Sequence, residues 1–268
     1  QILYNIVTMR IINLSSGSDG NVTFIQTEKA NLLLDDGLSC QETVKRLSAI
    51  GISPDSIDGI IVSHEHSDHI KGIDVFSSKY QVPVFAHQDV WVGLDDKLKK
   101  VLLKHRKIFD GQFQFEDVLV CPVEVPHDVK CFGFSFSQGN KKISVVTDLG
   151  HINDKIINSI SHSQIIYLEA NYDRDMLFKG TKYPLSLKRR IDGPNGHLSN
   201  SVSAEAIEKL VAHGARQIVL SHLSKENNTP ELAFNFITTK IGNDGIKEGV
   251  DVRIDVASTN IGSFFKLK

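Results

Sequence analysis

Residues 63–72 read SHEHSDHIKG and place three histidines and an aspartate within six positions, directly after the apolar run DGIIV. Alternate residues of an extended chain share a side, so His64, His66 and Asp68 face one way, whereas His69 begins the next element. Imidazoles and carboxylates without thiolates are donors that suit zinc, manganese or iron. A solvated polar loop is the alternative, but HxHxDH is far denser than chance placement of the 11 histidines would give. The segment therefore indicates a site for two adjacent metal ions.

Further candidate ligands stand where other apolar runs end. VLVCPVEVP leads into His127, KISVVT leads into Asp148, and RQIVLS leads into His222. A single histidine at a strand end is more often structural than a ligand. Sites in layered α/β folds, however, gather where the carboxyl ends of strands meet, so these residues are expected to converge with the histidine cluster.

The pattern of elements favours one mixed α/β domain. Runs of strand length are RIINL, VTFIQT, NLLLD, GIIVS, PVFA, VLVCPVEV, CFGFSF, KISVVT, QIIYLE and RQIVLS. Ser39 and Glu42 form a capping box for a helix over 40–50, and a second helix over 202–211 ends before Gly214. Because no linker or repeat interrupts the pattern, we predict a single domain over 9–268 and an upstream segment over 1–8.

Composition excludes several classes of protein. The 268 residues are 41% hydrophobic and 23% charged, and the net charge is −2, so the whole chain exerts no general attraction on nucleic acid or membrane. We find no membrane span and no signal segment. Three cysteines without a CxxC motif indicate free thiols in a reducing compartment. The expected location is the cytoplasm, without a membrane partner.

Several motifs resemble those of a known family. HxHxDH followed by a single histidine, TDLG and LSHLS resembles the metallo-β-lactamase superfamily, and LLLDDG matches its first motif at Asp35. SSGSDGN, YPLSLKRRIDGPNGHLSN and LSHLSKENNTPELA are similar to the YycJ/WalJ (VicX) branch of exonucleases, and the resemblance runs from about Met9 to Ala233. It implies an αββα four-layer sandwich and a 5′-to-3′ DNA exonuclease.

The same resemblance implies a division of the ligands between two divalent ions, zinc or manganese, with iron as a further candidate. One ion would be held by His64, His66 and His127, the other by Asp68, His69 and His222, and Asp148 would bridge the two. Asp35 would fix the HxHxDH loop by hydrogen bonds and bind no metal.

Two metal ions indicate a hydrolase, because they activate water and stabilise charge on entering and leaving oxygens, and phosphodiesters are natural substrates for such a pair. Asp68 or Asp148 is expected to hold the attacking water. In GPNGHLSN, two glycines allow a tight loop that presents His197 as the general acid for the leaving oxygen. The alternative is that His197 caps a helix that begins near Asn200.

A short basic run precedes that loop. We expect Lys182, Lys188, Arg189 and Arg190 to contact the phosphate backbone of the substrate, although a charge run is usually a solvated face. Tyr183 either stacks on a base or packs. His151 either lines the site or belongs to a loop, and His87, His105, His162 and His213 are expected to be structural.

DNA is the expected partner, and RNA is the alternative. An RNA-processing nuclease or a small-molecule phosphodiesterase would use the same centre. A metal-binding regulatory module linked to cell-wall two-component signalling is an alternative of another class. The basic run and His197 favour nucleic acid over a small substrate, and the complete set of seven ligands argues against a module without turnover.

Overall fold

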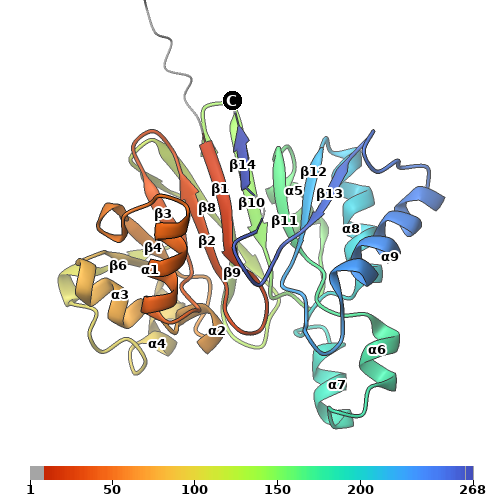
Figure 1. Cartoon of the computed structure of the whole chain (residues 1–268), viewed down its shortest axis with the longest axis horizontal. Helices are drawn as coiled ribbons and strands as arrows, with labels where there is room; N and C mark the ends of the chain where they lie inside the picture. The colour runs from red at the N-terminus through yellow and green to blue at the C-terminus, as the bar shows by residue number, and fades with distance from the viewer. Residues whose placement is uncertain (1–8, 263, 268) are drawn as a thin grey trace, which may run out of the picture.

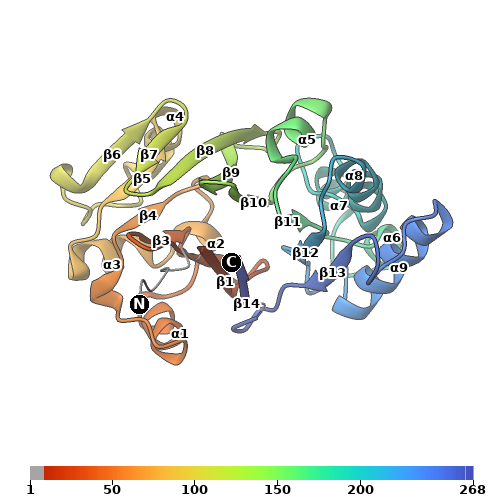
Figure 2. The same cartoon turned by 90° about the horizontal axis from the view of Figure 1, so that it is seen from above.

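The computed structural model describes residues 9–262 and 264–267. Within them, two seven-stranded sheets lie face to face, and helices cover both outer sides (Figures 1 and 2). The expected αββα four-layer sandwich is therefore confirmed. The predicted upstream segment 1–8 lies outside the described residues, so the division of the chain at residue 9 stays a prediction.

Each sheet combines an antiparallel half with a parallel half. The first sheet has the order β14 (Phe264–Leu267), β1 (Met9–Ser15), β2 (Val22–Gln26), β3 (Asn31–Leu34), β4 (Gly59–Ile61), β5 (Val84–His87) and β6 (Arg106–Phe109), and it is parallel from β3 onward. The second has the order β13 (Arg253–Val256), β12 (Gln217–Ser221), β11 (Ile165–Glu169), β10 (Lys141–Val146), β9 (Cys131–Gln138), β8 (Val118–Val125) and β7 (Phe113–Phe115), and it is parallel from β10 to β13.

Helices cover the outer faces. The first sheet carries α1 (Cys40–Ala49), α3 (Ile73–Tyr80) and α4 (Gln88–Leu94), and the second carries α5 (Asp154–Ile160), α8 (Asn200–Ala212) and α9 (Pro230–Asn243). Three short helices, α2 (Ser67–Ile70), α6 (Arg174–Lys179) and α7 (Leu185–Ile191), lie at the lower edge in Figure 1. Two 3₁₀ turns, η1 (Pro54–Ser56) and η2 (Leu103–His105), complete the elements. Among residues 9–262 and 264–267, we find no helix with the length and apolar character of a membrane span.

Strand β11 explains why the sheets need cover on both sides. All five of its residues are buried. Ile165 and Tyr167 join the core between the sheets, whereas Ile166 and Leu168 join the core under α5, α8 and α9. Successive side chains of a strand point to opposite faces, so a run without polar alternation is stable only between two layers.

The direction of the strands creates one functional edge. Six strands run toward the lower edge in Figure 1: β3, β4, β8, β10, β11 and β12. Strand β8 has the same direction as β10 because both pair antiparallel with β9, and the other strands of each sheet follow through parallel pairs. The segments that follow these strands therefore emerge together. This geometry brings donors from distant parts of the sequence to one place.

Most predicted elements are present. Each of the ten apolar runs forms a strand, and Ser39 is confirmed as the N-cap of α1 because its side chain accepts a hydrogen bond from the backbone N–H of Glu42. The side chain of Glu42 pairs with Lys45 and Arg46, so the predicted capping box is confirmed only for its Ser39 half. The second predicted helix is α8, and Gly214 follows it with φ of 90°, a conformation that glycine adopts readily. Strands β6, β7, β13 and β14 were not predicted.

Candidate metal centre

The HxHxDH loop is fixed from behind by Asp35, which follows β3. Its Oδ1 accepts a hydrogen bond from the backbone N–H of Ser63 at 2.8 Å. Its Oδ2 accepts from Ser63 Oγ and from Nδ1 of His69, each at 2.7 Å. Both carboxylate oxygens are thus occupied by the loop, which leaves Asp35 as a residue that orients His69.

The backbone of residues 21 and 36–37 holds the other side of the loop. The N–H groups of Asn21 and Asp36 donate to the carbonyls of Asp68 and His69, each at 2.8 Å. A side chain at Gly37 would place its Cβ 1.6 Å from the carbonyl oxygen of Asp68. Only glycine permits this approach, so the segment LLLDDG contributes its glycine as well as its first aspartate to the site.

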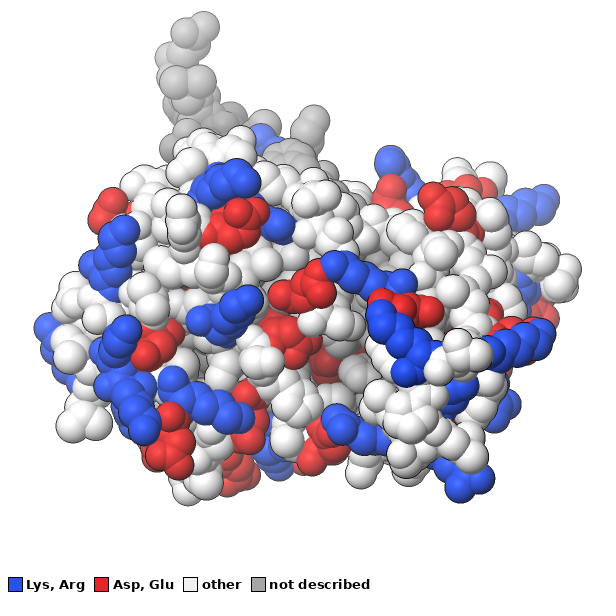
Figure 3. Space-filling model, turned by 60° about the horizontal axis from the view of Figure 1, so that its bottom comes forward, with Lys and Arg blue, Asp and Glu red and all other residues white. Residues whose placement is uncertain are grey.

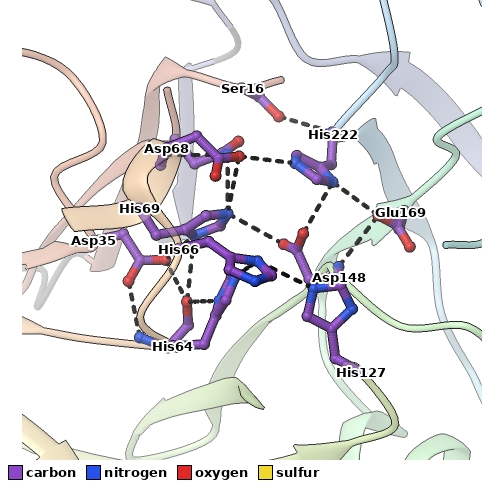
Figure 4. Close-up of polar contacts among 12 residues, drawn as sticks. Ser16, Asp35, His64, His66, Asp68, His69, His127, Asp148, Glu169 and His222 are labelled. Atoms are coloured by element: carbon purple, nitrogen blue, oxygen red, sulfur yellow. Dashed lines mark hydrogen bonds and ion pairs between the residues drawn. The ribbon is translucent and has the colours of Figure 1, made fainter. Parts of the chain in front are cut away.

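Three histidines direct nitrogen atoms toward one point (Figure 4). Nε2 of His64 and Nδ1 of His66 are 3.1 Å apart, and Nδ1 of His66 is 3.4 Å from Nε2 of His127. The opposite nitrogen of each ring faces a protein oxygen. Nδ1 of His64 is 2.9 Å from Ser63 Oγ, Nε2 of His66 is 3.3 Å from Asp128 Oδ1, and Nδ1 of His127 is 3.3 Å from the carbonyl oxygen of Gly196. When those oxygens accept the ring protons, a neutral imidazole keeps its lone pair at the shared point. This arrangement is suited to one metal ion.

A second group lies beside the first. Oδ2 of Asp68 is 3.6 Å from Nε2 of His69 and 3.6 Å from Nε2 of His222. Nδ1 of His222 donates to Oε1 of Glu169 at 2.8 Å, as Nδ1 of His69 donates to Asp35. These contacts again direct Nε2 of each ring to the centre.

Asp148 lies beside both groups, because its carboxylate is within 4.8 Å of donor atoms of His64 in the first group and His69 in the second. Its Oδ2 is 3.3 Å from Nε2 of His69, and its Oδ1 is 3.4 Å from Nδ1 of His222. Within the described part of the chain, Oδ2 of Asp148 and Nε2 of His222 are buried and have no hydrogen-bond partner. Buried polar atoms without partners are costly, and a divalent cation would satisfy both. The donors present therefore fit a metal centre.

The protonation states agree with that chemistry. Burial lowers the pKa of His64 well below its ordinary value, which keeps this imidazole neutral. Burial raises the pKa of Asp148, but His222 and His69 outweigh it and hold the pKa well below the ordinary range. Burial lowers the pKa of His222, but Asp148, Asp68 and Glu169 outweigh it and raise the pKa to about 10. The carboxylates thus favour a cation here, and a bound metal would compete with protons.

Glu169, at the end of β11, was missed in the sequence. Its side chain is fully buried, and its two oxygens accept from His197, His222 and three backbone N–H groups, at 2.8 to 3.2 Å. Burial raises the pKa of Glu169, but His197 and His222 outweigh it and lower the pKa to about 2. The run QIIYLE ends in an acid as KISVVT leads to Asp148, so the rule of donors at strand ends would have found it.

His197 lies in the loop before α8 and next to the metal ligands. Its Nδ1 donates to Oε1 of Glu169 at 2.9 Å and lies 3.9 Å from Oδ1 of Asp148, and its side chain is 22% exposed. Burial lowers the pKa of His197, but Glu169 outweighs it and raises the pKa. The residue that caps α8 is Ser199, so the alternative of a capping role for His197 is wrong.

Two neighbours support the loop that carries His197. Nδ1 of His151 contacts the carbonyl of Pro194 at 3.0 Å, while the side chain remains exposed. A Cβ on Gly150 would lie 2.3 Å from the backbone of Pro194. Of the two roles considered for His151, the loop position is the one observed.

The basic run divides into different environments. Lys188 is buried, and its amine donates to the backbone carbonyls of Phe178 and Gly180, so the prediction of a substrate contact for Lys188 is corrected: its charge joins α6 to α7. Lys182 forms an ion pair with Glu226, and Arg189 is exposed. Figure 3 shows Lys and Arg on both sides of a central hollow with acidic side chains in it.

Asp128 was also missed, although it directly follows His127. Its Oδ1 is 3.3 Å from Nε2 of both His66 and His127, and its Oδ2 is 2.7 Å from Nη2 of Arg190. Asp128 therefore connects two of the candidate metal ligands to the basic helix α7.

Three residues of the site have left-handed backbones. Asp35, Asp148 and His222 have φ values of 59°, 60° and 57°. Side chains disfavour this region, and such strain is typical of functional sites.

Comparison with known proteins agrees with the geometry. The beta-lactamase superfamily domain matches residues 30–223. The chain is 34% identical over 246 residues to the exodeoxyribonuclease WalJ of Streptococcus pneumoniae, and the match covers 90% of this chain and 91% of the relative. It is 35% identical over 223 residues to the exodeoxyribonuclease YycJ of Bacillus anthracis, with 82% and 84% covered.

A solved structure shows the same fold at low sequence identity. The metallo-beta-lactamase fold protein YhfI from Bacillus subtilis superposes with a TM-score of 0.73 at 17% identity and covers 97% of this chain and 99% of that chain. The sandwich described above is thus a metallo-β-lactamase fold. With a superfamily domain over most of its length and relatives above 30% identity, the chain belongs to the WalJ/YycJ family of the β-lactamase superfamily.

Proposed function

We propose that this protein is a metal-dependent exodeoxyribonuclease that hydrolyses phosphodiester bonds of DNA from the 5′ end. One observation carries the proposal: six other candidate ligands converge around Asp148, whose buried Oδ2 has no hydrogen-bond partner among the described residues. His197, beside them, supplies a proton donor. Relatives named exodeoxyribonucleases support DNA as the substrate.

The donor set supports two divalent ions, zinc or manganese, with iron as a further candidate. His64, His66 and His127 would hold one, Asp68, His69 and His222 the other, and Asp148 would contact both. When bound, such a pair activates a water molecule and neutralises charge on the phosphate.

The chain's own residues then divide the proton transfers. Asp68 has a 25% exposed side chain against 4% for Asp148, so Asp68 is the carboxylate that an attacking water reaches. The water oxygen forms a bond to phosphorus, the bond from phosphorus to O3′ breaks, and His197 donates its proton to O3′. Glu169 orients His197 and, by raising its pKa, keeps the imidazole protonated.

Electrostatic contacts would hold the DNA beside this centre. We place the backbone phosphates along Lys182, Arg189 and Arg190, all exposed around α7. A local track is required because the net charge of −2 gives no general attraction for a polyanion.

The test uses the purified chain with Mn²⁺ on duplex DNA labelled at either end, on RNA, and on bis(p-nitrophenyl) phosphate. We expect mononucleotides from the 5′ end of DNA and no such release by Asp148→Ala. Faster cleavage of RNA would replace DNA by RNA in the proposal. Turnover of the small phosphodiester alone would indicate a small-molecule phosphodiesterase, and metal binding without any turnover would indicate a regulatory module.

A further inference from the structure

A pocket opens between α7 and the metal centre. Its inner wall is formed by His127, Asp128 and His197, and its outer wall by Tyr183, Leu187 and Arg190. Its volume of about 180 Å³ far exceeds the ~10–15 Å³ that one water molecule requires, so it admits a much larger group. The pocket therefore offers space for part of a substrate directly beside the proposed general acid.

The outer wall is one face of a helix. Within α7, Arg190 and Ile191 follow Leu187 at spacings of three and four residues, which place them on the same side of the helix. Tyr183, which stands just before the helix, lines the same pocket. This wall presents an aromatic ring, two aliphatic side chains and a guanidinium. Such a combination suits a nucleoside that carries a phosphate: bases stack on aromatic rings, and arginine binds phosphate through paired N–H groups.

The loop of residues 193–197 connects the inner wall to the outer wall. A Cβ on Gly196 would lie 2.2 Å from the carbonyl oxygen of Ile191, so the loop lies directly against the end of α7. The carbonyl of Gly196 faces Nδ1 of His127 at 3.3 Å. One glycine thus connects the helix of the outer wall with a candidate metal ligand, and the pocket has a fixed distance from the centre.

Arg190 is held over the pocket by an ion pair with Asp128. Its Nη2 is 2.7 Å from Oδ2 of Asp128, and its side chain is 65% exposed. The guanidinium has further N–H groups, because arginine carries five. It can therefore keep its ion pair with Asp128 on one side and donate hydrogen bonds to a phosphate on the other.

We propose that this pocket holds the 5′-terminal nucleotide of the DNA strand, with its base against Tyr183 and its 5′-phosphate on Arg190. The inference rests on the proposed function, and it names the subsite that selects a chain end. When His197 donates its proton to O3′, the sugar that bears O3′ must lie against His197, which means inside this pocket. In cleavage from the 5′ end, this leaving sugar belongs to the terminal nucleotide.

The test compares duplex DNA with a 5′-phosphate and the same duplex with a 5′-hydroxyl. We expect the parent to prefer the phosphorylated end and Arg190→Ala to lose that preference, with partial recovery in Arg190→Lys. For Tyr183→Ala we expect kcat/KM on DNA to fall about 5- to 150-fold relative to that on bis(p-nitrophenyl) phosphate, the range of one stacked base. Tyr183→Phe should restore it.

Matched controls lie outside the pocket. Arg253 is 66% exposed and pairs with Asp255 at 3.2 Å, which reproduces the Arg190–Asp128 pair on edge strand β13. Phe236 on α9 is a partly exposed aromatic. Arg253→Ala and Phe236→Ala should keep both the preference and the DNA rate of the parent.

The outcomes separate the two proposals. If the parent degrades DNA from the 5′ end but treats both ends alike and Tyr183→Ala retains full DNA activity, the subsite is wrong and the nuclease assignment stands. If the parent does not degrade DNA at all, the proposed function itself fails.

Discussion

His197 and His222 are held by the same atom. Each ring directs Nδ1 to Oε1 of Glu169, at 2.9 Å and 2.8 Å. One ring belongs to the proposed general acid and the other to a candidate metal ligand. A single buried carboxylate therefore sets the orientation of both, and its loss should affect proton transfer and metal binding together.

The first prediction concerns Glu169→Gln. The carboxylate raises the pKa of His197 by favouring the imidazolium, so the neutral amide should let that pKa fall. Because proton donation requires the protonated ring, activity should be lost at lower pH than in the parent, and the rate should drop about 10- to 100-fold. Profiles of kcat/KM against pH at saturating metal check this. An unchanged alkaline limb would contradict the role given to Glu169.

The second prediction concerns metal content. Elemental analysis should find about two equivalents of divalent metal per chain, because two groups of donors share Asp148. Asp148→Ala should lose both ions. Asp154, an 84% exposed carboxylate in a surface ion pair, provides the control, and Asp154→Ala should keep the parent's content. Full occupancy in Asp148→Ala would exclude the bridging role.

A third prediction separates chemistry from metal binding at His197. His197→Ala should retain its metal while turnover of DNA falls about 10²- to 10⁴-fold, the usual contribution of general acid–base catalysis. A p-nitrophenolate leaving group needs no proton, so bis(p-nitrophenyl) phosphate should be largely spared. Equal losses on both substrates would assign His197 to structure.

The fourth prediction concerns stability and Asp36. This side chain is fully buried, Thr43 donates to its Oδ1, and burial raises its pKa to about 7. A carboxyl whose pKa is higher in the folded than in the unfolded state, where it is about 3.9, stabilises the fold below pH ~4 and loses that contribution as pH rises through 7. Relative to Asp36→Asn, the parent's free energy of unfolding should therefore decrease by up to about 4 kcal/mol between pH 4 and 8. Urea unfolding across that range measures it, and parallel curves for the two proteins would refute the assignment.

The fifth prediction tests the phosphate track by salt. Each contact with duplex DNA contributes a slope of roughly −0.9 to the dependence of log K on log salt. Replacing Lys182 and Arg189 by Ala should flatten the slope by one to two contacts. Lys209, in a surface ion pair on α8, is the control, and Lys209→Ala should leave the slope unchanged. If the double variant keeps the parent's slope, the phosphates follow another surface.

The sequence predicted the layers well because buried strands carry a strong signal. Runs such as QIIYLE are apolar on both faces, and the sheet needs helices on each side of them. The edge strands β6, β7 and β13 are three or four residues long and partly exposed, so their composition resembles that of loops. Their pairing is decided by neighbours distant in the chain.

Site residues that directly follow a strand could be predicted from the sequence, because donors gather where strands end. Residues whose roles depend on contacts between distant segments could not. Donors after strands gave His127, Asp148 and His222, and the same rule covers Glu169, which was overlooked. The inward position of Lys188 could not be read from a charge run, because the seven residues of α7 give no periodicity that separates an inner from an outer face. The pairing of Arg190 with Asp128 joins segments that only the fold brings together.

The left-handed backbones of Asp35, Asp148 and His222 have a consequence for metal choice. Each such conformation costs about 1–3 kcal/mol and persists only because the surrounding sheets over-determine it. The backbone therefore positions the donors Asp148 and His222 directly, and His69 through its hydrogen bond to Asp35, so a change in their spacing would disturb β10, β12 or β3. We therefore expect any discrimination among divalent metals of similar affinity for nitrogen and oxygen to depend on ionic radius, because the scaffold resists a change in the spacing of the donors.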